Sequence, residues 1–322
     1  MTTLESHAGE NQTFSDIFIL VGFSYLNNLQ ILLFLVFLLT YFLILMGNLF
    51  IILLIKLSPS LHTPMYFFLV NLSFLEVCFT TSVIPQLLVH LLVEEKSISF
   101  LGCAGQMYIF IITGLTVSCL LATMAYDRYV AICHPLRYTT ILSGRMCALL
   151  MGVSWTISIS VAGAQTMWLF SQPFCGSNRI HHYFCYTGPL EKMVCTDKRK
   201  SVNMGLPIVL LFVMGPFFLI VLSYVHIIST ILKLPSLEGR YKAFSTCSSH
   251  LTVVTLIYGT GILSYVKPTS SSTPESDQLI SVMYTVVSPV LNPIIYTLRN
   301  KEVKGALRNI LRRAISLNNR RY

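Results

Sequence analysis

The sequence predicts an all-α membrane protein, a bundle of seven transmembrane helices followed by a short amphipathic eighth helix. Of the 322 residues, 54% are hydrophobic and only 11% are charged, whereas a soluble domain carries about 25% charged residues. Seven apolar runs recur along the chain, each able to supply the roughly 20 residues that a helix needs to cross the hydrocarbon core. Lys and Arg are also divided unevenly between the two sides of the membrane that these runs define.

The seven runs are continuous rather than alternating, which favours helices over strands. Glu76 lies within the second run, and the Asp127–Arg128 pair ends the third. The runs do not resemble one another in the way that the inverted repeats of many transporters do. They occupy residues 29–56, 64–90, 100–126, 145–169, 203–232, 243–266 and 278–298.

A shorter helix is predicted over residues 300–314, where apolar residues recur every three or four positions with Lys and Arg between them. This pattern is typical of a helix that lies in the membrane interface. We therefore divide the chain into an N-terminal segment (1–28), a seven-helix transmembrane domain (29–298) and an eighth helix with a tail (299–322).

The distribution of basic residues predicts the orientation in the membrane. The side that holds the C-terminus carries 15 of the 22 Lys and Arg residues, and such an excess marks the cytoplasmic side. The N-terminus is then extracellular, in a multi-pass protein of the plasma membrane. Because the first residues are polar and lack the pattern of a signal peptide, the first run is expected to be both targeting signal and span. The net charge of +9 indicates topology and attraction to anionic membrane lipid, not nucleic-acid binding.

Two features of the predicted outer side agree with this orientation. Asn11 begins an Asn-Gln-Thr glycosylation site. Four of the nine cysteines also fall outside, and an even number in an oxidising compartment favours two disulfides. Their spacing allows three connectivities and does not choose among them. The four are Cys103, Cys175, Cys185 and Cys195.

The charged pair Asp127–Arg128 stands in the stretch MAYDRYVAICHPLRY, at the predicted cytoplasmic end of the third span. A charge at the membrane edge is costly unless it is paired or functional. An anchoring role would explain Arg128 but not an adjacent acid flanked by Tyr126 and Tyr129. A switch explains both: Asp127 holds Arg128 in one state, and Arg128 meets a cytoplasmic partner in the other.

Four motifs in this order resemble those of the odorant receptors, a branch of the rhodopsin-like G-protein-coupled receptors. The first is MAYDRYVAICHPLRY, and the pair Gly47-Asn48 in the first span fits as well. The resemblance extends from about residue 20 to about residue 310. The other three motifs are LHTPMYFFLVNLSFLE (61–76), KAFSTCSSHLTVV (242–254) and PVLNPIIYTLRNKEV (289–303).

The resemblance implies roles for residues at the matching positions. Cys103 would pair with Cys185, and Cys175 with Cys195. The segment Asn292–Tyr296 would form a switch in the seventh span, where a proline permits a local kink. For each tyrosine, the alternative role is anchoring in the membrane interface. The implied switch residues are Asp127, Arg128, Tyr129, Tyr224, Asn292, Pro293 and Tyr296.

The resemblance also places a ligand pocket in the outer half of the bundle. Its wall is largely apolar, which suits a small, neutral, mostly hydrophobic molecule such as a volatile odorant. For any single position, helix packing is the competing interpretation. The implied lining residues are Met107, Phe110, Ile111, Gly114, Leu115, Ser118, Ile208, Phe212, Tyr258, Gly261, Ile262 and Tyr265.

Glu76 departs from the family pattern, which usually has Asp at this position. A second acid that is frequent in the third span of odorant receptors is replaced here by Val117. An acid within a span is a functional hypothesis by default. Glu76 either helps to hold a sodium ion or is protonated and hydrogen-bonded to Asn48 or Asn292. Because desolvation disfavours the charged form of a lone carboxyl group, we favour the proton.

The sequence therefore predicts an odorant receptor that activates a stimulatory heterotrimeric G protein and raises cyclic AMP. A rhodopsin-like receptor for a lipid, a peptide or another small ligand is the first alternative, and a transporter or channel is the second. Catalysis has no support, because no histidine is grouped with a carboxylate and a nucleophile. We expect no cofactor and no metal.

Overall fold

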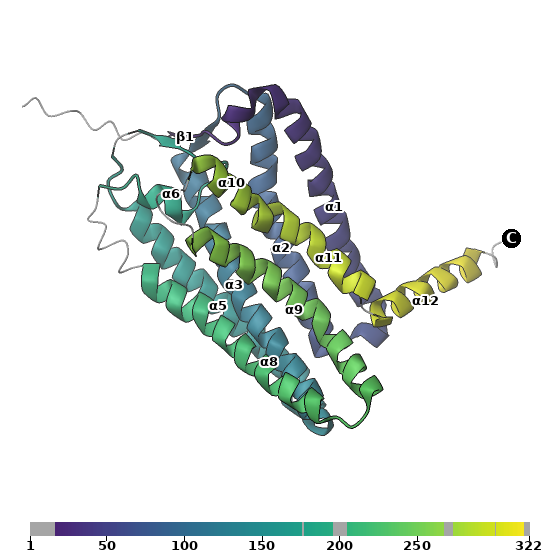
Figure 1. The fold of residues 1–322 in the computed structure, drawn as a ribbon. Helices are drawn as coiled ribbons and strands as arrows, with labels where there is room; N and C mark the ends of the chain where they lie inside the picture. The colour runs from purple at the N-terminus through teal and green to yellow at the C-terminus, as the bar shows by residue number, and fades with distance from the viewer. Residues whose placement is uncertain (1–16, 176, 196–204, 267–272, 300, 319–322) are drawn as a thin grey trace, which may run out of the picture.

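The computed structural model describes residues 17–175, 177–195, 205–266, 273–299 and 301–318. Long helices lie side by side in a bundle, and α12 turns away from it where α11 ends (Figure 1). The helices that build the bundle are α1 (Gln30–Leu57), α2 (Pro64–Leu92), α3 (Phe100–Cys133), α5 (Gly144–Phe170), α8 (Gly215–Lys233), α9 (Leu237–Val266), α10 (Pro274–Val282) and α11 (Ser288–Arg299).

The remaining elements are short, apart from the terminal helix. Two π-helical turns lie directly before α8 and α11: η4 (Leu210–Met214) and η5 (Met283–Val287). The others are η1 (Ser24–Leu29), η2 (Pro59–Leu61), η3 (Pro135–Arg137), α4 (Tyr138–Ile141), α6 (Thr187–Glu191) and α12 (Lys301–Asn318).

The helices follow the apolar runs closely, with the larger differences at the sixth run, where α9 begins at Leu237 instead of residue 243, and at the third. The apolar run ends at residue 126, but α3 continues to Cys133. The residues after Arg128 contain neither Gly nor Pro, so the backbone has no reason to leave the helix in this stretch. The helix ends at Cys133 because the next residue, His134, precedes Pro135, and a residue before proline is disfavoured in helical geometry. The extension places Arg128 within the last two turns of a regular helix.

Six of the described helical segments are long and apolar enough to cross a membrane, and α9 is the seventh long helix of the bundle. Its first half carries Ser245, Ser248, Ser249 and His250, which lower its mean hydropathy. It nevertheless packs against α3, α8 and α11. This contact within the bundle makes α9 the seventh membrane helix, as the sequence predicts.

Burial divides the helices into central and peripheral ones. The most apolar stretch of α3 is mostly buried, whereas that of α1 is mostly exposed. Side chains such as Ile31, Leu39 and Met46 on α1 project outwards. Exposed apolar surface of this extent would be a liability in water. In a bilayer it contacts lipid chains, so the outer helices keep apolar residues on every face.

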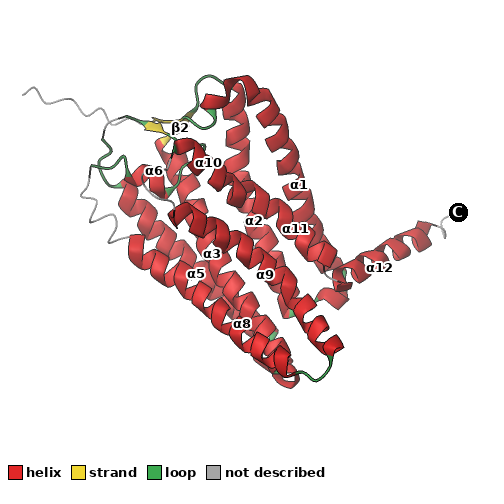
Figure 2. Ribbon diagram, in the orientation of Figure 1, coloured by secondary structure: helices red, strands yellow, loops and turns green. Residues whose placement is uncertain are grey.

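A three-stranded sheet covers one end of the bundle, and the sequence analysis did not predict it (Figure 2). β1 (Ile17–Leu20) lies between β2 (Ser97–Ser99), to which it is antiparallel, and β3 (Arg179–Ile180), to which it is parallel. Strands this short form only against partners that the tertiary fold supplies. Gly22 follows β1 with a φ of +49°, a left-handed conformation that glycine adopts without strain.

Two disulfides fasten the long loop between α5 and α8 at the same end. Cys103 at the start of α3 is bonded to Cys185, with Cα atoms 5.4 Å apart. Cys175 is bonded to Cys195 within the loop, with a Cα distance of 5.5 Å. These are the pairs that the family resemblance implies. Asn11, the predicted glycosylation site, lies outside the described residues.

Candidate functional site

The loop that Cys185 anchors forms a lid over the end of the bundle that carries β1. His182 is buried and its Nε2 lies 3.0 Å from the Ser281 hydroxyl of α10. The Tyr183 hydroxyl lies 2.8 Å from that of Thr285 in η5. On the opposite side, the Cys185 amide donates a hydrogen bond of 2.7 Å to Gln106 on α3. The lid is thus tied to both the third and the seventh membrane helix.

Burial sets the protonation of the two lid residues. It lowers the pKa of His182 to about 3, because the charged imidazolium is poorly solvated there. It raises the pKa of Tyr183 for the same reason. Both side chains are therefore neutral near pH 7, and each hydrogen-bonds to an uncharged hydroxyl group.

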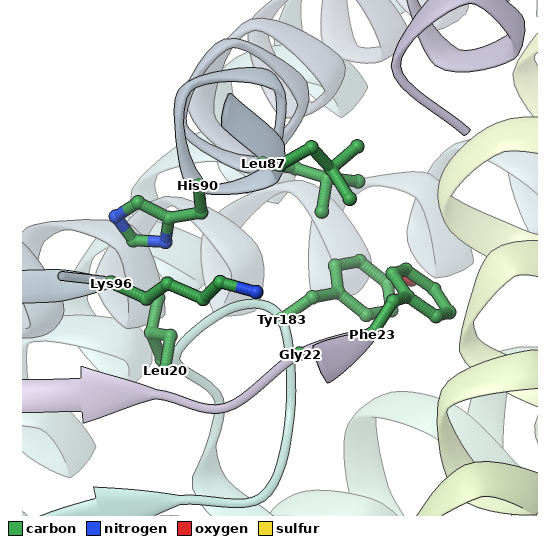
Figure 3. A pocket seen from close by; sticks show the side chains of 8 residues that line it. Leu20, Gly22, Phe23, Leu87, His90, Lys96 and Tyr183 are labelled. Atoms are coloured by element: carbon green, nitrogen blue, oxygen red, sulfur yellow. The ribbon is translucent and has the colours of Figure 1, made fainter. Parts of the chain in front are cut away.

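A cavity of about 10 Å³ lies beneath the β1 strand, between the lid and α2. Figure 3 shows Lys96 extending its amino group into this space near Tyr183. The amino group donates a 2.9 Å hydrogen bond to the Ser24 hydroxyl, and burial lowers the pKa of Lys96. The volume accommodates about one water molecule and no organic ligand.

The structure brings six of the twelve predicted ligand residues together below the lid. Met107, Ile111 and Leu115 are buried in one hydrophobic cluster with the Cys103–Cys185 disulfide. Phe110, Ile208 and Phe212 pack against the same cluster. Side chains from α3 and from the start of the fifth span therefore share an apolar region in the outer half of the bundle.

Gly114 and Gly261 lie beside open space. A Cβ atom added to either residue would meet no atom within 4 Å, apart from the residue's own neighbours. These two positions are on α3 and α9. Space of this kind next to an apolar cluster is what a small hydrophobic ligand needs.

The sixth span supplies the polar part of this region. Tyr258 is buried, packs on Phe217 with ring centroids 5.1 Å apart, and lies within hydrogen-bonding reach of Ser118. Ile262 is 49% exposed. It belongs to none of the hydrophobic clusters that the described residues form. The side chain of Tyr265 lies outside the described part of the chain.

Sequence reasoning missed the aromatic residues that surround Phe110. Its ring centroid is 5.5 Å from that of Phe184 and 5.9 Å from that of Tyr186, both in the lid. Tyr284 of η5 contributes a third ring at 6.1 Å. The positions of Phe184 and Tyr186 could have been inferred from the implied disulfide, because a bond between Cys185 and Cys103 forces the neighbours of Cys185 to lie over α3.

A polar cluster occupies the middle of the bundle. Asn292 of α11 donates a hydrogen bond to Glu76 of α2, and Asn48 of α1 donates to the carbonyl of Ile44 at 3.0 Å. Among the described residues, the second Glu76 oxygen and the side-chain oxygens of Asn48 and Asn292 have no hydrogen-bond partner. The cluster therefore has unused acceptors, which a proton on Glu76 or a cation would satisfy.

Asp127 and Arg128 form an ion pair in this structure. Arg128 donates to Asp127 Oδ2 from Nε at 2.9 Å and from a terminal nitrogen at 2.5 Å. Tyr138 of α4 donates to the other oxygen, Oδ1, at 2.7 Å. Asp127 is fully buried and the Arg128 side chain is 12% exposed. Both carboxylate oxygens have partners, so the geometry holds the guanidinium against its neighbour and away from solvent.

Other predicted switch residues lie on the helices around this pair. The Tyr224 hydroxyl of α8 is 2.7 Å from His250 Nδ1 of α9, and the two rings are stacked. Sequence reasoning missed His250, since nothing in the sequence indicates that it faces Tyr224. Tyr296 is buried, and its hydroxyl has no partner among the described residues. The Tyr129 hydroxyl lies 3.2 Å from His134 Nε2.

Comparisons with known proteins agree on one family. A family model described as olfactory receptor matches residues 37–314. Olfactory receptor 10A4 of Homo sapiens is 52% identical over 95% of this chain and 98% of its own. Olfactory receptor 10A5 of Homo sapiens is 51% identical over 94% and 96%. Among solved structures, squid rhodopsin aligns with a TM-score of 0.68 at 19% identity, covering 87% of this chain and 80% of the other. At that identity the likeness concerns the fold.

The buried lid histidine predicts a pH dependence of stability. Unfolding returns the pKa of His182 from about 3 to its ordinary 6.5, so below pH 6.5 the unfolded chain gains a proton that the folded chain excludes. The contribution of neutral His182 to stability is therefore fully present above pH 6.5. Below that pH the free energy of unfolding falls by up to about 1.4 kcal/mol per pH unit. Thermal unfolding of the purified protein at pH 7 and pH 5 measures this loss. His182→Gln should reduce the pH-induced shift, and an equal shift in both proteins would contradict the assignment.

Proposed function

The chain belongs to the olfactory receptor family of rhodopsin-like G-protein-coupled receptors, and from this premise we propose that it detects a small, mostly hydrophobic volatile odorant and activates a stimulatory G protein. Family membership makes it a multi-pass membrane receptor that signals through a heterotrimeric G protein and is not an enzyme. It also excludes the transporter or channel alternative. The place of the ligand, the type of G protein and the rise in cyclic AMP are our proposals.

The observation that carries the proposed ligand site is the apolar cluster of Met107, Ile111 and Leu115 beneath the lid. An apolar wall binds neutral molecules by excluding water and offers no partner to a charged ligand. The open space at Gly114 and Gly261 supports a ligand between α3 and α9. The hydroxyl groups of Ser118 and Tyr258 then provide the few polar contacts that orient it.

The orientation in the membrane has support from chemistry at the two ends of the bundle. Both disulfides are at the end that carries β1 and the lid, and disulfides persist in an oxidising compartment. The basic residues of α12 are at the other end. We therefore place the lid outside the cell, and Arg128 with α12 in the cytoplasm.

Signal transfer would use the polar contacts between helices. A ligand shifts the equilibrium between two receptor states only if it binds one of them more tightly. In the state observed here Arg128 is held by Asp127, and Tyr224 is held by His250. In the alternative state we propose that Tyr224 and Tyr296 turn towards Arg128, which is then free to contact the G protein.

The role of Glu76 is proposed to be that of a neutral hydrogen-bonding group. A proton on the oxygen that lacks a partner would donate to a free oxygen of Asn48 or Asn292. A sodium ion would need several oxygen ligands, and Val117 replaces the second acid that would supply one. Neutral Glu76 therefore links α2 to α11 without a buried charge.

The proposed ligand space is tested by filling it. We expect Gly114→Leu to raise the odorant concentration for half-maximal cyclic AMP about fivefold or more, because Leu and the odorant would occupy the same space and overpacking costs about 1–3 kcal/mol. A panel of small neutral volatiles supplies the agonist, and basal cyclic AMP is measured beside it. Gly152→Leu on α5 is the matched control, because a Cβ there also meets no atom within 4 Å. Equal responses in the two variants would place the ligand elsewhere.

The coupling role of Arg128 is tested by removing its guanidinium. Arg128→Ala should abolish the odorant-induced rise of cyclic AMP in cells with matched surface expression, because the group that meets the G protein is gone. Odorant binding should persist, since Arg128 lies far along α3 from the lid. Arg137→Ala, an exposed arginine of η3 in the same region, controls for the loss of positive charge. An intact response in Arg128→Ala would refute the role.

The state of Glu76 is tested with a neutral isostere and a change of salt. If the carboxyl group is protonated, Glu76→Gln keeps its size and hydrogen-bonding capacity, and the odorant response should survive. Replacing sodium chloride by choline chloride in membrane preparations should leave ligand affinity unchanged in the original protein. A sodium dependence that disappears in Glu76→Gln would instead establish a cation site.

A further inference from the structure

An apolar groove of about 420 Å³ opens on the outside of the bundle, where α1, α11 and α12 meet. Its volume is within the range of small-molecule sites in proteins. Figure 1 shows α12 leaving the bundle beside the ends of α1 and α11, which places the groove at this corner. The lining residues are Gly47, Phe50, Pro293, Ile294, Thr297, Val303, Lys304 and Leu307.

The back wall of the groove is formed by a close approach of two helices. A Cβ atom on Gly47 would lie 3.1 Å from the Pro293 ring, so the absence of a side chain there lets α1 approach α11. Phe50 and Ile294 flank this contact and remain 40% and 42% exposed. Apolar surface at this position in the bundle faces lipid chains and not water.

The rim of the groove on the side of α12 is basic. Lys304 lines the groove and is exposed. Arg308 and Arg312 follow at four-residue spacing, are exposed, and extend the positive charge along the same helix. The nearest acid in the sequence, Glu302, accepts a 2.7 Å hydrogen bond from Tyr66 of α2. That bond also fixes α12 against the bundle.

We propose that this groove binds one anionic phospholipid of the cytoplasmic leaflet, with an acyl chain against Phe50 and Ile294 and the phosphate at Lys304. An apolar channel that opens to lipid and ends at a cation matches the two parts of such a molecule. The proposal uses the membrane orientation given above but does not depend on odorant binding or on the G protein. The lipid would join α1, α11 and α12 at the base of the helix that carries Asn292 and Tyr296.

The test uses the full-length protein in nanodiscs of phosphatidylcholine that contain a small fraction of phosphatidylserine with a photoreactive acyl chain. After irradiation, mass spectrometry locates and quantifies the labelled peptides. We expect label within residues 294–307, and competition by unlabelled phosphatidylserine. Soluble glycerophosphoserine, which has the headgroup without acyl chains, should not compete.

Two pairs of variants separate the two parts of the site. Lys304→Gln should reduce the label about fivefold, the value of one basic residue near anionic lipid. Lys233→Gln, which removes the same charge at the end of α8, should not. Ile294→Trp should obstruct the acyl chain, whereas Leu39→Trp on the exposed face of α1 should not.

The outcomes decide the proposal. Equal labelling from a photoreactive phosphatidylcholine, or unchanged labelling in Lys304→Gln, would overturn the choice of an anionic lipid. Competition by glycerophosphoserine would indicate a site for the free phosphate group and would overturn it as well. Because Lys304 is exposed, its replacement by Gln should not impair folding, so the test stands even if Ile294→Trp fails to fold.

Discussion

The absence of water in the hydrocarbon core is the constraint on which the rest of this structure depends. A polar group there must find its partner within the protein. The backbone meets this demand by forming helices, and the side chains meet it in pairs. Glu76 accepts from Asn292, Asp127 accepts from Arg128, and Tyr224 is bound to His250. These pairs fix which faces of the central helices point inwards, because any other rotation would expose a polar group to lipid.

The same constraint makes the receptor suited to switching. A buried polar pair cannot loosen gradually into solvent, so it changes by exchanging one partner for another. Among the described residues, the buried groups without a hydrogen-bond partner include the Tyr296 hydroxyl and the second oxygen of Glu76, and both could take part in such an exchange. Discrete partners give discrete states, which is what a ligand needs in order to select one of them.

The two ends of the bundle differ in whether their apolar surface is covered. At the outer end, the sheet and the disulfide-anchored loop bury it, and His182 and Tyr183 tie this cover to the seventh span. At the other end, α12 leaves an apolar groove open beside a basic rim at Lys304. The first arrangement suits the small neutral ligand proposed above. The second suits a molecule that remains part of the membrane.

The sequence by itself determined the membrane class, the positions of the helices and the family, because apolar run length and short motifs are local properties. It also located Asp127 and Arg128, which are neighbours in the chain. Only the tertiary structure decided contacts between distant segments, such as the strand at Ile17–Leu20 and the facing of His250 to Tyr224. Such contacts depend on which helices are adjacent and on how each helix is rotated about its axis. An apolar run indicates almost nothing about either property, because lipid and neighbouring helices are equally apolar surroundings.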